Sequence, residues 1–426
     1  RAARAPGRFT RGASCDPATP CAGGALCCAS VCVDASSDDA NCGACGRVCL
    51  EAKVCVSRDC ACADKAGAGA KVASLSAGFD HTCALFSDGA VKCWGQNGFS
   101  QLGDGTTIDR RTPVLVRGLC REALEVASGA EHTCVLLRGG AVKCWGTNGY
   151  GQLGDGTLTT TDAPGPTLDL GGPAVSVVSG WYHSCALLAD AKVKCWGWNE
   201  LGQLGDGTTV DRRTPVTVAG IRGRPVALAS GAEHVCAILS DGGVQCWGVA
   251  GFGQLGDGSA VTSRLTPVVN ALAGPVERLD LGDFHTCAVL RGGALQCCGF
   301  NQFGQIGDGS TVDRLTPVTV PVGGPTSFVA GGYEHTCAVL VGGAVKCWGV
   351  NDQGQVGDGT RTERHSPVAV GLGAGAVAVS VALGYTHSCA LLSDGVVKCW
   401  GRNALGQLGD GTATNRLTPV TVSGLP

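Results

Sequence analysis

Pairs of cysteines ten residues apart have the most regular chemical spacing in this chain of 426 residues. Two thiols at a fixed spacing can form a disulfide, hold a metal ion or stay reduced as small apolar groups in a core. The spacing recurs along the sequence, so whatever chemistry one pair performs is repeated in every copy. The pairs are Cys83 with Cys93, Cys134 with Cys144, Cys185 with Cys195, Cys236 with Cys246, Cys287 with Cys297, Cys337 with Cys347, and Cys389 with Cys399.

The residues between the cysteines favour a disulfide. In the first copy, Ser87-Asp88-Gly89 separates two short apolar runs, which is typical of a hairpin loop with glycine in the left-handed region. Such a loop places Cys83 directly opposite Cys93, at a separation that a disulfide can span. We therefore expect one cross-strand bridge in each copy, and free buried cysteines are the alternative. The third copy has Ala191 instead of glycine, so this alanine must tolerate the left-handed turn or the loop must differ.

A histidine precedes the first cysteine of each pair and recurs at intervals of 50 to 52 residues. Seven imidazoles suggest a metal ring, but a whole repeat separates neighbouring histidines, so they cannot converge on one ion. We expect each ring to be hydrogen-bonded to the backbone, and we expect neither a metal nor a cofactor. The histidines are His81, His132, His183, His234, His285, His335 and His387.

The cysteine content also indicates a cellular compartment. The chain has 27 cysteines, and oxidising compartments favour paired thiols, so we expect an exported protein that is extracellular or in the cell envelope. A reducing cytosol would instead require metal sites or free thiols. The formal net charge of −3 gives no reason to expect nucleic acid, and no apolar run is long enough to span a membrane.

The elements that must position these residues are short strands. The first copy reads VASLSAGFDHTCALFSDGAVKCWGQNGFSQLGDGTTIDRRTPVLV, with apolar or alternating runs between glycine-rich turns and no helical period. Seven copies fill residues 71–426. Four strands in each copy predict an all-β fold, a seven-bladed β-propeller of repeats of about 51 residues. A solenoid of stacked hairpins is the alternative.

A small disulfide-rich module precedes the propeller. We expect a disordered N-terminal segment over 1–14, the module over 15–62 and a flexible linker over 63–70. The module has too few apolar residues to fold without disulfides, although Cys42, Cys45 and Cys49 could hold zinc instead. Eleven cysteines leave one over, which can pair with Cys120, and Cys298 then stays free. The eleven are Cys15, Cys21, Cys27, Cys28, Cys32, Cys42, Cys45, Cys49, Cys55, Cys60 and Cys62.

Three motifs recur with few changes in every copy: Gly-x-x-His-Thr (Gly78 to Thr82), Trp-Gly-x-Asn (Trp94 to Asn97) and Gln-Leu-Gly (Gln101 to Gly103). In these motifs, residues 71–426 resemble the regulator of chromosome condensation repeat family, in its alpha-tubulin suppressor-like bacterial branch. The resemblance implies a seven-bladed propeller. It does not imply one function, because the family includes a nuclear nucleotide-exchange factor, a plant ultraviolet photoreceptor and a secreted bacterial inhibitor of β-lactamase.

Other repeated residues are expected to build the scaffold. A tryptophan follows the second cysteine in six copies, and we expect it to pack between neighbouring blades. We expect the aspartate of the Gly-Asp-Gly turn to pair with a nearby arginine, which the second copy lacks, and a ring of exposed arginines that binds an anionic partner is the alternative. The tryptophans are Trp94, Trp145, Trp196, Trp247, Trp348 and Trp400; the aspartates are Asp104, Asp155, Asp206, Asp257, Asp308, Asp358 and Asp410; the arginines are Arg110, Arg212, Arg264, Arg314, Arg364 and Arg416.

The two residues between Gly and His differ most clearly between copies. Six aromatic and five acidic residues occupy these fourteen positions. Propeller geometry should bring all seven loops to one face around the channel, where exposed aromatic clusters mark binding sites. Rings that merely cap the channel are the alternative. The predicted partner-binding residues are Phe79, Asp80, Glu131, Trp181, Tyr182, Glu233, Asp283, Phe284, Tyr333, Glu334 and Tyr385.

No nucleophile with a base and an orienting group is recognisable, so we do not expect an enzyme. We expect an exported binding scaffold that recognises a protein or a cell-surface polymer through the Gly-x-x-His loops. The acidic residues favour a partner with basic patches. The alternative is a guanine-nucleotide exchange factor or other regulator of a small GTPase, as in the nuclear family member. The cysteine content argues against it, because small GTPases work in a reducing cytosol.

Overall fold

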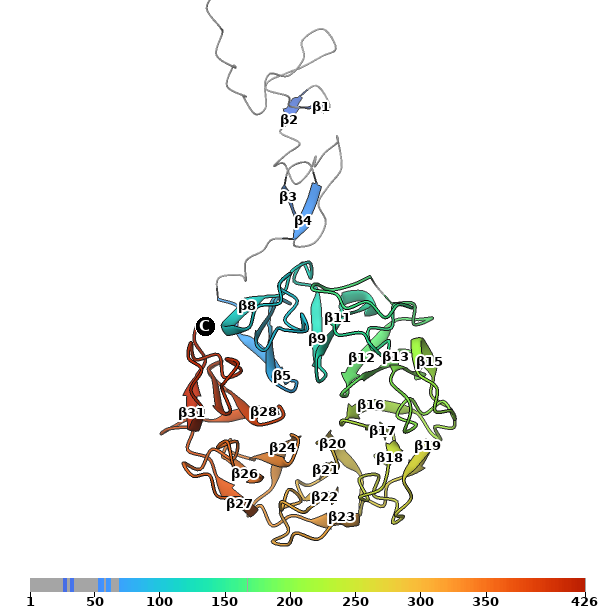
Figure 1. Ribbon diagram of the computed structural model, residues 1–426, viewed down its shortest axis with the longest axis vertical. Coiled ribbons are helices and arrows are strands. Elements are labelled where there is room, and N and C mark those ends of the chain that lie inside the picture. Colours follow the sequence, from blue (N-terminus) through green and yellow to red (C-terminus); the bar gives the residue numbers. More distant parts are fainter. Residues whose placement is uncertain are drawn as a thin grey trace, which may run out of the picture. The chain divides into compact units, whose positions relative to one another are not determined.

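The computed structural model describes residues 69–166 and 168–425, together with four short strands nearer the N-terminus (Figure 1). Residues from 69 onward form a seven-bladed, all-β propeller, as predicted. The strands nearer the N-terminus form two hairpins: β1 (Leu26–Cys28) pairs with β2 (Val31–Val33), and β3 (Lys53–Val56) pairs with β4 (Asp59–Cys62). The expectations for residues 1–14, the module's cysteine pairing, its zinc alternative and the linker lie outside the described residues. Cys120 is disulfide-bonded.

Each blade is an antiparallel sheet whose strands follow chain order from the channel to the rim (Figure 1). The innermost strands are β5 (Val72–Ala77), β9 (Ala123–Ser128), β12 (Ala174–Ser179), β16 (Pro225–Ser230), β20 (Val276–Leu281), β24 (Thr326–Gly331) and β28 (Ala378–Leu383). The second strands are β6 (His81–Phe86), β10 (His132–Leu137), β13 (His183–Leu188), β17 (His234–Leu239), β21 (His285–Leu290), β25 (His335–Leu340) and β29 (His387–Leu392).

The third strands are β7 (Val91–Gly95), β11 (Val142–Gly146), β14 (Val193–Gly197), β18 (Val244–Val249), β22 (Leu295–Gly299), β26 (Val345–Gly349) and β30 (Val397–Gly401). The outer strands are β8 (Arg110–Leu115), β15 (Arg212–Thr217), β19 (Ser263–Val269), β23 (Arg314–Thr319), β27 (Arg364–Ala369) and β31 (Arg416–Thr421). The 3-10 turn η2 (Arg138–Gly140) lies in a hairpin of the second blade.

The second blade has three strands instead of the expected four, which corrects the sequence prediction. In place of an outer strand, the described chain beyond β11 has an isolated bridge between Gly146 and Thr161. Pro164 and Pro166 account for the difference, because neither can donate a backbone hydrogen bond to a sheet. The segment still lies along β11, since the Gly165 N–H donates to the Cys144 carbonyl at 3.0 Å.

A disulfide closes the hairpin between the second and third strands of every blade, as the sequence spacing predicted. In the first blade Leu85 faces Val91 and Cys83 faces Cys93, which is the predicted register. The Cα atoms of each pair are 4.1 Å apart. All fourteen sulfurs are buried, so the alternative of free core cysteines is wrong for these positions. The bridges are Cys83–Cys93, Cys134–Cys144, Cys185–Cys195, Cys236–Cys246, Cys287–Cys297, Cys337–Cys347 and Cys389–Cys399.

The second cysteine of each bridge lies on the third strand of its blade. There it is fully or almost fully buried and directly faces the first cysteine across the sheet. These second cysteines are Cys93, Cys144, Cys195, Cys246, Cys297, Cys347 and Cys399. Cys298, beside one of them, is free, as expected. It is also buried, and burial raises its pKa to about 12, which makes it a poor nucleophile.

The apolar core lies between neighbouring blades, where the repeated tryptophans are fully buried, as predicted. Each indole N–H donates to the backbone carbonyl of the repeated glutamine in the preceding blade; Trp145 reaches Gln101 at 3.0 Å. The first and last blades each consist of four consecutive strands, so the ring closes without an exchanged strand. Trp94 of the first blade donates to the Gln407 carbonyl of the last blade at 2.9 Å. The contact that joins each pair of neighbours therefore also joins the two ends of the propeller.

The repeated histidines contact side chains of the next blade, which corrects the expectation of backbone partners. His132 Nε2 lies 2.8 Å from Ser184 Oγ, and that hydroxyl donates to the Gln152 carbonyl, so it accepts from the histidine. The last blade contacts the first in the same way, through His387 and Thr82. Burial lowers the pKa of six of the rings to about 3 and of His285 to about 4, so all seven are neutral at physiological pH.

The repeated aspartates and arginines form ion pairs in six blades, as predicted. Arg212 lies 2.7 Å from Asp206, and that aspartate also accepts a hydrogen bond from Thr208. Each pair ties the long turn after the third strand to the start of the outer strand. The guanidinium groups are therefore held by the scaffold, which leaves less support for a ring of arginines that recruits an anionic partner. The other pairs are Arg110–Asp104, Arg264–Asp257, Arg314–Asp308, Arg364–Asp358 and Arg416–Asp410.

The substitution Ala191→Gly should stabilise the third blade. Ala191 adopts a φ of 67°, the strained left-handed conformation in which the other hairpins have glycine. Removing its Cβ should raise the free energy of unfolding by roughly 0.5–1 kcal/mol, after the added backbone entropy of glycine is subtracted. Ala189→Gly in the same loop is the control, and it should lower that free energy by roughly 0.4–1 kcal/mol. Denaturant titration measures both, and an equal loss for both variants would refute the strain.

Candidate functional site

The seven Gly-x-x-His loops connect the innermost strand of each blade to the second strand and surround one mouth of the channel. Glycine is required at their start because a Cβ on Gly78 would lie 2.3 Å from the His81 ring. The loops also bond to one another: the N–H of Trp181 donates to the carbonyl of Ala232 at 3.1 Å, and the N–H of Tyr385 donates to the carbonyl of Phe79 at 3.1 Å. Their variable side chains therefore project from a backbone that neighbouring blades hold in place.

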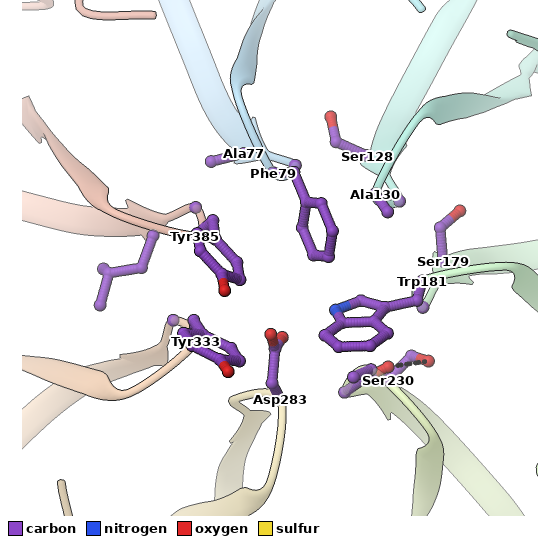
Figure 2. Close-up of a pocket in the computed structure, with 18 of the residues that line it drawn as sticks. Ala77, Phe79, Ser128, Ala130, Ser179, Trp181, Ser230, Asp283, Tyr333 and Tyr385 are labelled. Atoms are coloured by element: carbon purple, nitrogen blue, oxygen red, sulfur yellow. Dashed lines mark hydrogen bonds between the residues drawn. The ribbon is translucent and has the colours of Figure 1, made fainter. Parts of the chain in front are cut away.

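The first variable residue of each loop points toward the channel axis. Figure 2 shows Phe79, Trp181, Tyr333 and Tyr385 around the mouth, with Asp283 between them. The alanines of the second and fourth blades complete the circle and leave room for the large rings beside them. Together these side chains line an open depression of about 80 Å³, and the rings are half-buried, not fully enclosed. The rings thus narrow the channel, which was the alternative interpretation, and still present surface to solvent.

In two loops the second variable residue contacts aromatic rings of the loop that follows the third strand. Tyr182 contacts Tyr150 and Trp198, with ring centroids 5.2 and 6.4 Å away. Phe284 contacts Phe252 and Phe300 in the same manner, at 5.8 and 6.4 Å. We define the GxxH face as the seven Gly-x-x-His loops plus these adjoining loops.

Sequence reasoning missed the aromatic residues of the adjoining loops. They occupy variable positions just after the repeated Trp-Gly, so the comparison between copies that singled out the Gly-x-x-His pairs would have found them too. Phe99, Tyr150 and Phe252 are 40%, 41% and 37% exposed, which is unusual for such large apolar rings. The missed residues are Phe99, Tyr150, Trp198, Phe252, Phe300 and Phe303.

The predicted acidic residues have different environments. Asp80 is part of the scaffold, because it forms an ion pair with Arg402 of the last blade at 3.1 Å and accepts a hydrogen bond from Gln407 at 2.6 Å. Glu131, Glu233 and Glu334 make no ion pair with another described residue. Burial raises the pKa of all three, and in Glu334 the nearby Asp352 and Glu363 help to raise it to about 7.

Asp283 is the most perturbed acid of the face. Burial, with smaller contributions from Glu233 and Glu334, raises its pKa to about 8, and the nearby Trp181 indole partly opposes this rise. The indole N–H does not reach hydrogen-bond geometry, so Asp283 Oδ2 is buried without a partner among the described residues. A buried carboxyl without a partner is costly, so its retention at the channel mouth requires an explanation.

The chemistry that the face offers is apolar contact, aromatic stacking and attraction of positive charge. Within residues 69–166 and 168–425, no three His, Cys, Asp or Glu side chains gather in a way that could hold a metal ion. No helix in the described part of the chain has the length and apolarity to cross a membrane.

The repeats match a known family. The model described as "Regulator of chromosome condensation (RCC1) repeat" matches residues 88–136, 140–187, 190–238, 293–339, 343–391 and 394–426. A second model of the same description matches one segment in each of the seven copies, from 72–101 to 378–407. The chain belongs to the RCC1 repeat family.

Relatives with RCC1 repeats have varied roles. The chain is 33% identical over 358 residues to the ultraviolet-B receptor UVR8 of Arabidopsis thaliana, which covers 83% of this chain and 70% of the receptor. It is 30% identical over 248 residues to the human E3 ubiquitin-protein ligase HERC2, which is 57% of this chain but only 5% of the ligase. These names show that the repeat occurs in proteins of different function.

Two solved structures share the fold. Yeast Prp20p superposes with a TM-score of 0.70 at 23% identity, over 83% of this chain and 88% of its own. Human WBSCR16 superposes with a TM-score of 0.69 at 24% identity, over 76% of this chain and 88% of its own. At this level of identity, the likeness establishes the fold and leaves the function to be argued from this RCC1-repeat chain's own residues.

The substitution Asp283→Asn should change how stability depends on pH. The carboxyl has a pKa of about 8 when folded and an ordinary value of 3.8 when unfolded. Between these values the folded protein holds a proton that the unfolded chain has lost, so stability falls as pH rises toward about 8. Asparagine does not titrate, so the variant's advantage over the wild type should grow through this window and then level off.

Denaturant titrations across the pH window measure this difference. Glu277→Gln, which changes an exposed carboxyl of the same blade, is the control and should leave the pH dependence of the wild type unchanged. An Asp283→Asn curve that runs parallel to the wild type from acid to neutral pH would show that Asp283 is ionised in the folded protein.

Proposed function

We propose that this protein is an exported, non-enzymatic scaffold that docks a partner protein on the GxxH face. The observation that carries the proposal is the set of large rings held part-exposed on mutually bonded loops. Burying a tryptophan or tyrosine that is already ordered costs little entropy, which is why such residues dominate the binding energy of interfaces. A protein fits better than an extended polymer, because the aromatic groups spread around the mouth and do not line a single groove.

The acidic residues of the face support a partner with basic patches. Glu131, Glu233 and Glu334 have no ion pair among the described residues, and each would gain a charge-assisted hydrogen bond from a partner's lysine or arginine. Such contacts would also favour ionisation of these carboxyls, which burial now opposes.

The disulfides support export. Seven buried bridges in one domain require an oxidising environment during folding, such as the periplasm or the cell exterior. The alternative, regulation of a small GTPase, would place the same cysteines in the reducing cytosol. No observation on the GxxH face specifically favours that alternative.

Removing two rings of the face should abolish partner capture. The double variant Trp181→Ala with Tyr333→Ala deletes two candidate hot spots, and we expect recovery of the partner from culture medium or cell envelope to fall at least about tenfold. Val341→Ala is the matched control: this residue is 66% exposed in the hairpin between β25 and β26, at the other face. Quantitative mass spectrometry of captured proteins reads out both. Retention of every captured partner by the double variant would refute the proposed face.

A further inference from the structure

Five aromatic rings of the GxxH face form a closed circle at the channel mouth. Four of them are the first variable residues of their loops, and Phe284, the second variable residue of the fifth loop, completes the circle. The centroid separations are 5.1 Å for Phe79–Trp181, 5.8 Å for Trp181–Phe284, 6.1 Å for Phe284–Tyr333, 4.1 Å for Tyr333–Tyr385 and 5.0 Å for Tyr385–Phe79.

The carboxyl group of Asp283 lies among the four rings that are first variable residues (Figure 2). Figure 2 shows it projecting between Trp181 and Tyr333, with the indole nitrogen of Trp181 turned toward the centre. Asp283 Oδ2 and Trp181 Nε1 are both buried and complete no hydrogen bond with a described residue, although the indole is near enough to act on the carboxyl. A ligand group that enters the depression could satisfy the carboxyl oxygen.

We propose that this circle is an aromatic cage for a cationic side chain, a lysine ammonium or an arginine guanidinium that the docking partner inserts into the channel mouth, with Asp283 as its counter-ion. The inference rests on the proposed function, since it names the chemical group that the face recognises. Aromatic rings around the cation would contribute cation–π attraction, and the carboxylate would contribute an ion pair shielded from water.

The surroundings of the cage favour a cation over a neutral or anionic group. The charged groups that act on Asp283 are Glu233 and Glu334, so the local field is negative. Arg402, a nearby base of the same face, is already held by Asp80. An anionic group would be repelled by the neighbouring glutamates, and a neutral apolar group would leave Asp283 without a partner.

Occupation of the cage should be linked to pH. Asp283, whose pKa burial raises to about 8, faces Trp181 and Tyr333 and is influenced by Glu233 and Glu334. A bound cation stabilises the ionised carboxylate, so binding below about pH 8 must release a proton. Affinity should then rise by up to about tenfold for each pH unit as pH approaches 8, and level off above it.

Isothermal titration calorimetry of the full chain tests the cage with Nα-acetyl-lysine methylamide and Nα-acetyl-arginine methylamide as probes. Nα-acetyl-norleucine methylamide is the neutral control of similar shape. We expect the cationic probes to bind at least about tenfold more tightly than norleucine at about pH 8, to release close to one proton at about pH 7 in buffers of different ionisation enthalpy, and to bind more weakly at about pH 6.

Two variants make the test specific. Asp283→Asn, which keeps the shape of the side chain, should lose both the proton release and the pH dependence of binding. Glu277→Gln in the same blade should keep both. Near-ultraviolet circular dichroism verifies that each variant is folded. Absence of binding by both cationic probes, equal binding of norleucine, or proton release that persists in Asp283→Asn would overturn the cage. Tighter binding of tetramethylammonium than of either probe would overturn the assignment to a side chain.

Probe binding and partner capture test the cage and the docking face separately. If the probes fail to bind while Trp181→Ala with Tyr333→Ala still loses its partner, the face docks a protein without a central cation. If the probes bind and the double variant retains its partner, the cage is a site for a cation unrelated to docking, and the assignment to a partner's side chain falls.

Discussion

Three consecutive rungs of the hairpin between the second and third strands determine the geometry of every blade. In the first blade these rungs pair His81 with Gly95, Thr82 with Trp94, and Cys83 with Cys93. The last of these pairs is a disulfide, and the other two contain the groups that bond to neighbouring blades. The histidine contacts a threonine hydroxyl of the next blade, and the threonine hydroxyl and the indole N–H both donate to a glutamine carbonyl of the preceding blade. A bridge that fixes the hairpin register therefore also fixes the contacts that close the ring.

The same arrangement explains why recognition falls to the Gly-x-x-His loops. Each loop ends at the histidine of the first rung, so its backbone is held by its own blade, and in five loops a backbone N–H also donates to a neighbouring loop. Side chains there can change without loss of the scaffold, because their backbone bonds do not depend on residue type. The copies have diverged at these positions, and the divergence produced one continuous aromatic and acidic surface. A preorganised surface of this kind binds with a smaller entropic cost than flexible loops would.

Most of the fold could be predicted from the sequence, because the spacing of the repeated motifs gives the length of each blade and the spacing of the cysteines gives the register of its hairpin. The Cys83–Cys93 pairing, the buried tryptophans and the Asp–Arg pairs followed from spacing alone. The histidine partners did not, since a hydroxyl one blade away is about fifty positions distant in the chain. The missing strand of the second blade was visible in the sequence only as a change in the repeated motif around Pro164. For the site, sequence identified the loops, but it could not show that Phe284 joins the circle while Tyr182 turns to Trp198, because that depends on the size of residues in neighbouring blades.

The disulfide in each blade is the feature on which both the rigid scaffold and the proposed export depend. Peptide mapping without reduction, on protein isolated from its native source and alkylated before unfolding and again after it, reports the state of every cysteine. Seven peptides linked through cysteines ten residues apart, with Cys298 alkylated only after unfolding, are the predicted result. Recovery of Cys83, Cys93 and their counterparts as alkylated thiols would contradict it, and would refute both the disulfide-stabilised scaffold and the proposed export.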